Sequence, residues 1–194
     1  AYAIIDDRSY AVNDKCIVVD NVLDTLQHLA KYHRLQFSIP FIAITGSNGK
    51  TTTKELIAAV LRTKYVTYAT EGNLNNHIGV PLTLLKIKGD AQMAIIEMGA
   101  NHQQEIASYC TIAEPDYGLI TNVGKAHLEG FGGFEGVKKG KGELYEYLAR
   151  NGKTVFINGD NPHLKEMAVN RHVGKMFRYG TDPAFDCFGE LVEE

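Results

Sequence analysis

The sequence FIAITGSNGKT, residues 41–51, joins a continuous apolar run to a glycine-rich turn and to the start of a helical pattern. The run at residues 41–44 has no polar alternation, which is typical of a strand covered on both faces of a sheet. The glycines that follow let the backbone turn tightly and point its N–H groups inward, and the N-terminus of the next helix favours an anion. The stretch therefore predicts a phosphate-binding loop between a buried strand and a helix over residues 51–62.

Lys50 and Thr51 are the side chains of this loop that carry chemistry. In such loops the lysine reaches the β- and γ-phosphates and the hydroxyl ligates Mg²⁺. The general pattern has a further glycine five residues before Gly49, where this chain has Ile44, so the loop is a variant. The alternative is a turn with a chance Gly-Lys-Thr, but the strand, loop, lysine, hydroxyl and helix occur in order. We predict phosphate contacts from Gly46, Ser47, Asn48, Gly49, Lys50, Thr51 and Thr52.

Apolar runs and helical patterns alternate along the rest of the chain. Strands are expected at residues 65–68, 93–96, 117–123, 154–158 and 175–179, and helices at residues 103–113, 134–150 and 161–170. This alternation predicts an α/β fold, a mostly parallel sheet flanked by helices in a P-loop NTPase-like arrangement. In the helix over residues 51–62, we expect Leu56, Ala59 and Val60 to share one face.

Residues 1–40 have a different character. Two short strands at residues 3–5 and 16–19 and a helix at residues 23–34 are too little to close a core of their own. We therefore expect residues 1–38 to be the C-terminal remnant of a preceding domain plus a linker. Residues 39–194 then form a nucleotide-binding domain that is truncated before its end, with a C-terminal domain absent.

The composition excludes several classes of protein. The 194 residues carry 20 Lys+Arg against 23 Asp+Glu, a net charge of −3 that offers no basic face for nucleic acid. No run approaches the roughly 18 apolar residues that span a bilayer, so we expect no membrane partner. Cys16, Cys110 and Cys187 are widely spaced and form no CxxC pair, which indicates thiols in a reducing compartment, by default the cytoplasm.

Two polar segments follow expected strands or lie between glycines. Glu97 directly follows the apolar run at residues 93–96, and ligands collect at the carboxyl ends of parallel strands. A carboxylate there suits Mg²⁺, although a solvated glutamate is the alternative. The loop at residues 72–81 contains Asn75, Asn76 and His77, whose side chains can hydrogen-bond a phosphate or polar substrate. Asparagine and glycine also favour ordinary turns, which leaves both interpretations open.

The segment after the strand at residues 117–123 holds His127 and Glu129. Because they follow a strand end, a role at the site is as well supported by the sequence as a purely structural role. Lys141 lies on a helix with several other lysines and glutamates, and such a face is usually solvated. Physical reasoning on the sequence does not single out Lys141.

Four ordered motifs resemble the Mur ligase family, the ATP-dependent amide-forming enzymes of peptidoglycan synthesis. TGSNGKT at residues 45–51 matches the family's TGxxGKT loop, which accounts for the missing glycine. The other motifs are GNLNNHIGVPLTLL at residues 72–85, EMGANHQQEI at 97–106 and TNVGKAHLEGFGGFEGVKKGKGEL at 121–144. The match runs along nearly the whole chain.

The resemblance implies a role for each of the candidate residues. Lys50 and the loop backbone would hold the ATP phosphates, and Thr51 and Glu97 would bind Mg²⁺. His127 corresponds to the histidine of a second Mg²⁺ site. Lys141 falls where relatives carry a carbamylated lysine. Asn75 and Asn76 of the second motif would line the phosphate and substrate side of the site.

The resemblance also implies a reaction. Family members phosphorylate a terminal carboxylate with ATP and Mg²⁺, and an amine attacks the acyl phosphate. The motifs here imply UDP-N-acetylmuramoyl-tripeptide as acceptor, D-alanyl-D-alanine as amine, and a monomeric enzyme. We expect this chain to be inactive by itself, because it stops before the family's GxHNxxN motif and its C-terminal domain. The alternatives are a third-residue-adding ligase, a folylpolyglutamate synthase, or a nucleotide-binding module without chemistry.

Overall fold

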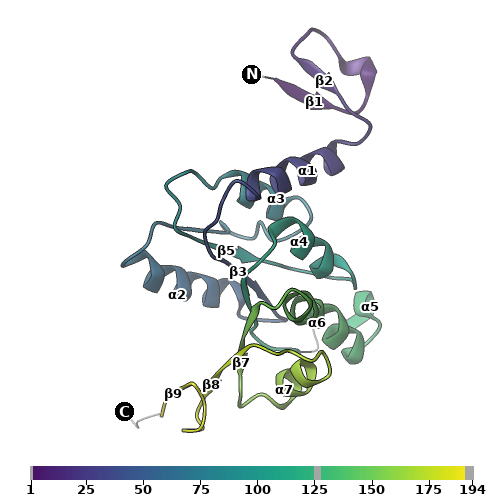
Figure 1. The fold of residues 1–194 in the computed structure, drawn as a ribbon. Coiled ribbons are helices and arrows are strands. Elements are labelled where there is room, and N and C mark those ends of the chain that lie inside the picture. Colours follow the sequence, from purple (N-terminus) through teal and green to yellow (C-terminus); the bar gives the residue numbers. More distant parts are fainter. Residues whose placement is uncertain (1, 125–127, 191–194) are drawn as a thin grey trace.

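The computed structural model describes residues 2–124 and 128–190, and its central feature is a seven-stranded sheet (Figure 1). Every neighbouring pair of strands in this sheet is parallel. Helices flank the sheet, so the predicted α/β fold with a mostly parallel sheet is confirmed. Across the sheet the strands are β4 (Thr67–Ala69), β5 (Met93–Glu97), β3 (Phe41–Thr45), β6 (Tyr117–Ile120), β7 (Thr154–Asn158), β8 (Met176–Gly180) and β9 (Cys187–Phe188).

The connections between strands run first to one side of β3 and then to the other. The chain leaves β3 for β4 at the edge, returns through β5 beside β3, and then crosses to β6 on the other side of β3. Ligands of open parallel sheets bind outside the carboxyl ends of the strands at such a point. The ends of β3, β5 and β6 are therefore where the fold favours a site.

The two faces of the sheet are covered by different helices (Figure 1). On one face, α2 (Lys50–Arg62) packs Ala58 against strand residues that include Ile44 and Ile95. The other face is covered by helices of the later crossovers, whose apolar residues join the larger core. These are α3 (Gly79–Leu85), α4 (Glu105–Ala113), α6 (Phe134–Arg150) and α7 (Pro162–Val169).

The buried face of α2 differs from the predicted one. Leu56 and Val60 are 64% and 70% exposed, whereas Lys54 and Ala58 are fully buried. Ile57 and Leu61 flank that buried stripe and pack against the sheet. Both stripes have helical spacing, so the periodicity could not decide between them, and the prediction that Leu56, Ala59 and Val60 form the buried face is wrong.

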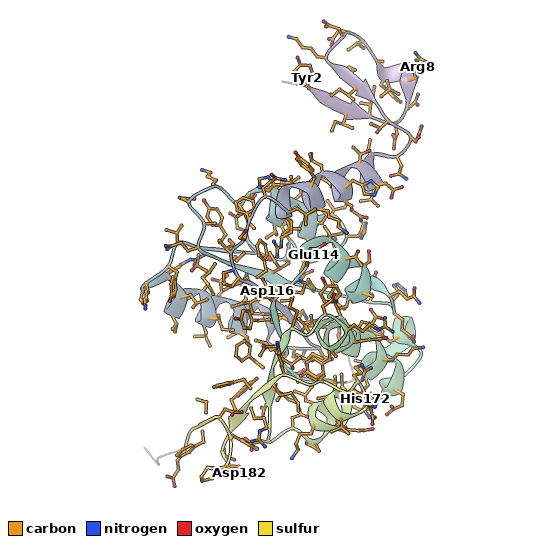
Figure 2. The ribbon with its side chains drawn as sticks, in the orientation of Figure 1. Tyr2, Arg8, Glu114, Asp116, His172 and Asp182 are labelled. Atoms are coloured by element: carbon orange, nitrogen blue, oxygen red, sulfur yellow. The ribbon has the colours of Figure 1, made fainter. Side chains whose placement is uncertain are left out.

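The N-terminal segment forms a small unit and a helix. β1 (Ala3–Ile5) and β2 (Cys16–Val18) pair in parallel around a short 3₁₀ helix, Arg8–Tyr10. Figure 2 shows Tyr2 and Arg8 at the end of the molecule far from the central sheet. The helix α1 (Val22–Arg34) instead lies against α3 and α4. The division of the chain near residue 38 stays a prediction.

Arg34 fastens the end of α1 to the central sheet. Its guanidinium donates to the carbonyl oxygens of Ala113 at 2.7 Å and Glu114 at 2.9 Å, and lies 3.7 Å from the centroid of the Phe41 ring. It also lies 3.8 Å from a carboxylate oxygen of Asp116. Glu114 and Asp116 are labelled in Figure 2 near the point where α1 approaches the sheet.

Most predicted elements exist with shifted ends, but the 3₁₀ helix, two α-helices and β9 were not predicted. α3 begins inside the asparagine-rich segment, where Gly79 and Pro81 suggested a loop. Pro81 is tolerated because it lies in the first helical turn, where backbone N–H groups have no partner within the helix. A short helix, α5 (Leu128–Phe131), precedes α6. None of the helices described is long and apolar enough to cross a membrane.

Candidate functional site

The turn after β3 has a backbone that depends on glycine. Gly46 has a φ angle of 146° and Gly49 a φ angle of 74°, a region that side chains disfavour. A Cβ atom at Gly46 would lie 2.0 Å from Thr121 Oγ1, because the chain after β6 approaches the turn closely. Gly49 leads directly into α2, so the turn and the helix N-terminus form the predicted strand-loop-helix unit.

The chain after β6 holds this turn in place. Ser47 N donates to Asn122 O at 3.0 Å, and Asn48 N donates to Asn122 Oδ1 at 3.1 Å. Thr121 Oγ1 and Asn122 Nδ2 donate in return to Asn48 O at 2.6 and 3.0 Å. Sequence reasoning missed Thr121 and Asn122. The predicted strand at residues 117–123 contained both residues, whereas β6 ends at Ile120 and leaves them just beyond the strand end.

Lys50 lies over the turn from the first turn of α2. Its Nζ donates to Gly46 O at 2.9 Å and to Ser47 O at 3.4 Å. Burial lowers the pKa of Lys50, and the nearby charge of Glu97 opposes that shift. The ammonium group is thus already held beside the backbone of the predicted phosphate loop.

Glu97 is the centre of the polar contacts at this edge of the sheet. The residue is 1% exposed, and its carboxylate accepts from Thr51 Oγ1 at 3.0 and 3.2 Å. Asn75 Nδ2 donates to Glu97 Oε1 at 2.7 Å. Lys54 Nζ lies 3.9 Å from the other carboxylate oxygen, Glu97 Oε2. The structure therefore brings three predicted residues, Thr51, Asn75 and Glu97, together with a fourth that sequence reasoning missed.

Asn76 has a different environment from Asn75. Its Oδ1 accepts from the backbone N–H groups of Ile78 at 3.1 Å and Gly79 at 2.8 Å, so it holds the backbone where α3 begins. Both asparagines nevertheless border a cavity of about 270 Å³. Its lining residues also include Lys50, His77, His102, Glu105 and Tyr109.

Lys141 is buried on α6, at 2% exposure. Its Nζ donates to Ala100 O at 3.1 Å and lies 5.1 Å from the centroid of the Phe131 ring. Burial, with a further contribution from the positive charge of Lys50, lowers the pKa of Lys141 from 10.5 to about 8. Lys141 is therefore not part of a solvated helix face, and its partner Ala100 lines the same cavity as Lys50.

The remaining predicted residues contribute less. Thr52 is exposed in the first turn of α2. Glu129 is exposed on α5. His127 lies outside the described residues, so its predicted role at a second Mg²⁺ site stays a prediction.

A larger groove lies elsewhere on the molecule. It has a volume of about 570 Å³ and is lined by residues of α6, α7 and the segment that follows α7. Its most buried lysine, Lys138, is already paired with Glu135 at 3.2 Å and with Glu166 at 2.9 Å. We therefore place the candidate site at the predicted phosphate loop, where polar side chains from the first turn of α2 and the end of β5 meet, and not in the larger groove.

The donor atoms at the strand ends suit a magnesium-bound nucleotide. Within residues 2–124 and 128–190, no three His, Cys, Asp or Glu side chains form a cluster that could hold a metal ion. Thr51 and Glu97 provide a hydroxyl and a carboxylate beside the phosphate loop. Mg²⁺ commonly takes one or two protein oxygens and completes its shell with phosphate oxygens and water, so this small set fits such an ion.

Comparison with protein families gives one match to most of the chain. A model described as "Mur ligase middle domain" matches residues 44–190. A UDP-N-acetylmuramoyl-tripeptide–D-alanyl-D-alanine ligase from Bacillus subtilis is 40% identical over 182 residues, which are 92% of this chain and 39% of that protein. The Escherichia coli ligase of the same name is 42% identical over 161 residues, or 83% of this chain and 35% of that protein.

Solved structures give the same result. A crystal structure of MurF from Acinetobacter baumannii superposes with a TM-score of 0.84 at 32% identity, covering 95% of this chain and 40% of that one. The MurF ligase from Thermotoga maritima in complex with ADP has a TM-score of 0.83 at 32% identity, covering 94% and 42%. The chain thus spans about 40% of the length of the proteins it matches.

Proposed function

This chain belongs to the Mur ligase family, and from that premise we propose that it is the nucleotide-binding part of a ligase that joins D-alanyl-D-alanine to UDP-N-acetylmuramoyl-tripeptide at the expense of ATP. The names of its relatives from B. subtilis and E. coli support this choice of substrates. The ADP complex of the T. maritima relative supports ATP as the phosphate donor.

The contact between Thr51 and Glu97 beside the phosphate loop is the observation that carries the proposal. It unites the first turn of α2 with the end of β5, two segments that lie 46 residues apart. A module that only folded around a glycine-rich turn would not need a carboxylate at 1% exposure there. A carboxylate and a hydroxyl beside bound phosphates are protein oxygens that Mg²⁺ commonly takes as ligands.

The residues of this site would act by binding and orienting. Lys50 and the loop backbone would bind the β- and γ-phosphates, and Thr51 and Glu97 would hold Mg²⁺, with Asn75 fixing the carboxylate. The ion neutralises charge on the phosphates when it is bound. An oxygen of the tripeptide carboxylate would attack the γ-phosphorus and ADP would leave. The dipeptide amine would then attack the acyl carbon, phosphate would leave, and the nitrogen would lose a proton to solvent. Such phosphoryl transfer depends mainly on positioning and electrostatic stabilisation.

Lys141 would carry a carbamate, as the family resemblance implies. A pKa of about 8 leaves part of the amine unprotonated near neutral pH. The free amine can attack the carbon of CO₂, forming an N–C bond and releasing a proton, which leaves one negative charge on the new group. That charge would help to position metal and γ-phosphate. His127 would hold a second Mg²⁺, and Asn76 would line the substrate side.

The arrangement of the whole protein is also part of the proposal. Residues 1–38 would connect to a domain that binds the uridine nucleotide, and a C-terminal domain would bring the dipeptide. The exposed apolar side chains of the β1–β2 unit support a neighbour there, since Tyr2, Tyr10 and Val12 are 76%, 70% and 82% exposed. We expect a cytoplasmic monomer.

Acceptor competition in the intact protein tests this function. The protein is given ATP and Mg²⁺ with UDP-N-acetylmuramoyl-tripeptide and D-alanyl-D-alanine, or with folate and glutamate, and products are identified by mass spectrometry. We expect dipeptide-dependent ADP release and an amide product with the tripeptide acceptor alone. Amide formation with folate alone would contradict the proposal. Dipeptide-dependent ATP turnover by the 194-residue chain would contradict the expectation that it is inactive by itself.

A further inference from the structure

Lys54 is a completely buried lysine to which the proposed function assigns no role. It lies one turn after Lys50 on α2, and its residue exposure is 0%. Its Nζ donates to Thr70 O, and lies 3.0 Å from Glu55 Oε1 and 3.9 Å from Glu97 Oε2. An ammonium group this deep is costly unless charged or polar partners compensate it.

The two carboxylates beside Lys54 are not equivalent. The Glu55 side chain is 57% exposed, so water screens its charge, whereas the Glu97 side chain is 1% exposed. Glu97 in turn has Lys54 as the one cation within ion-pair distance among the described residues. Among the described residues, each of these two groups is thus the one buried group of opposite charge within ion-pair distance of the other.

Thr70 joins the same pair through the backbone. Its carbonyl oxygen accepts from Lys54 Nζ, while its Oγ1 accepts from the backbone N–H of Glu97 at 2.9 Å. Thr70 also begins the segment that leads to Asn75, the donor on the other side of the Glu97 carboxylate. Lys54 thus links α2, the end of β5 and the asparagine segment at one point.

We infer that Lys54 is a positioning residue for the metal-binding carboxylate. Its ammonium holds Glu97 Oε2 and the Thr70 carbonyl together, so that the carboxylate stays oriented toward Thr51 and the phosphate loop. Without it, Glu97 has no cation within ion-pair distance among the described residues, and the Thr70 carbonyl loses its hydrogen bond from α2. This inference rests on the proposed function, because it requires Glu97 to be a Mg²⁺ ligand.

Nucleotide binding with and without Mg²⁺ tests the inference in the intact protein. A fluorescent ADP analogue is titrated into the wild type, Lys54→Met and the control Glu55→Gln, each at a series of Mg²⁺ concentrations. We expect Mg²⁺ to strengthen binding in the wild type and in Glu55→Gln. In Lys54→Met the Mg²⁺ concentration at half-effect rises about 10- to 100-fold, as when a supporting partner of a metal ligand is lost. The Kd measured without Mg²⁺ changes less than about twofold, because the phosphate loop is unaltered.

The outcomes separate the inference from the function on which it rests. A wild type that does not bind nucleotide, or binds it without regard to Mg²⁺, contradicts the proposed function. A wild type with a Mg²⁺ effect that Lys54→Met retains within about twofold overturns the inference alone, since a purely structural lysine would behave in that way.

A second variant covers the case in which Lys54→Met does not fold. The double variant Lys54→Met/Glu97→Gln removes both buried charges together. We expect it to fold, because neither group is then left charged without a partner. If Lys54→Met and the double variant both fail to fold while Glu97→Gln folds, Lys54 acts through other contacts and the inference is wrong.

Discussion

The α2 side and the α6 side of the site each bury one lysine, and the two lysines have opposite surroundings. Lys54 lies between a carboxylate that is 1% exposed and a backbone carbonyl. Lys141 has a backbone carbonyl and the face of an aromatic ring, and no carboxylate lies within ion-pair distance of it in the part of the chain that the structure describes. Both residues are at most 2% exposed.

This difference separates two uses of the same side chain. A buried ammonium with a buried carboxylate is a fixed charge that organises its surroundings. A buried amine without such a partner gives up its proton more easily and becomes a nucleophile, which is the condition for carbamylation. On the proposals above, one side of the site would be held by Lys54, and Lys141 on the other side would react with CO₂.

Glu97→Gln has the largest expected effect on stability, because it removes the buried carboxylate that Lys54 has beside it and Lys141 lacks. The variant keeps the shape of the side chain but leaves the ammonium with only the exposed Glu55. We expect the free energy of unfolding to fall by about 3 kcal/mol, as for a broken buried pair. Urea unfolding without nucleotide measures it. A loss below about 0.5 kcal/mol would mean that the pair at 3.9 Å is not a coupled one.

Lys141→Met tests whether the buried lysine of α6 makes the stability of the protein depend on pH. Because folding lowers the pKa of Lys141 from 10.5 to about 8, the unfolded chain binds more protons between these values, and wild-type stability rises with pH there. Below about pH 8 the cost of protonated Lys141 is present in full, up to about 3 kcal/mol. The methionine variant lacks that cost.

Unfolding of both proteins in buffers freed of CO₂ checks this prediction. We expect Lys141→Met to be more stable than the wild type at pH 7, and the difference to shrink as the pH rises from about 8 to 10.5. A difference that does not vary over this range would show that Lys141 keeps an ordinary pKa.

Phe131→Leu has a smaller expected effect on the same side. The Phe131 ring is 2% exposed and its centroid lies 5.1 Å from Lys141 Nζ. Loss of the ring face and of its packing lowers stability by about 1–2 kcal/mol at pH 7. The protonated amine also loses a favourable contact, so the pH-dependent rise in stability begins at a lower pH. If stability began to rise at the same pH as in the wild type, the Phe131 ring would have no effect on the pKa of Lys141.

Glu55→Gln is expected to have the smallest effect. Its carboxylate lies 3.0 Å from Lys54 Nζ, closer than Glu97, but its side chain is 57% exposed. Exposed pairs contribute little, so urea unfolding should show a change below about 0.5 kcal/mol. A loss of stability as large as that of Glu97→Gln would show that the exposed Glu55 carboxylate, and not the buried Glu97 carboxylate, balances the charge of Lys54.

The sequence predicted the strand ends of this site better than its supporting side chains. Lys50, Thr51 and Glu97 could be found because each follows or begins an element that the apolar pattern identifies. Lys54 could not, because a lysine in a helical pattern is usually solvated and its burial depends on how α2 lies on the sheet. The mistaken buried face of α2, with Leu56 and Val60, has the same cause.

Lys141 shows a different limit of prediction. Charge patterning favoured a solvated helix face, and only the family resemblance indicated this position. Its burial comes from packing of α6 against Phe131 and the chain after β5, contacts that join segments far apart in sequence. Asn75 and Asn76 were predicted to act together. In the structure, Asn75 donates to the Glu97 carboxylate, whereas Asn76 accepts from the backbone at the start of α3.

Calorimetric titration of ATP into the intact protein, with and without Mg²⁺, tests the central claim most directly when wild type and Lys50→Ala are compared. We expect the wild type to bind ATP more tightly with Mg²⁺, and Lys50→Ala to lose about 100-fold in affinity, the value of one or two charge-assisted hydrogen bonds to phosphate. The matched control, Lys64→Ala at an exposed lysine just after α2, should bind as the wild type does. Equal ATP affinity in Lys50→Ala and wild type would contradict the assignment of this edge of the sheet as a magnesium-nucleotide site.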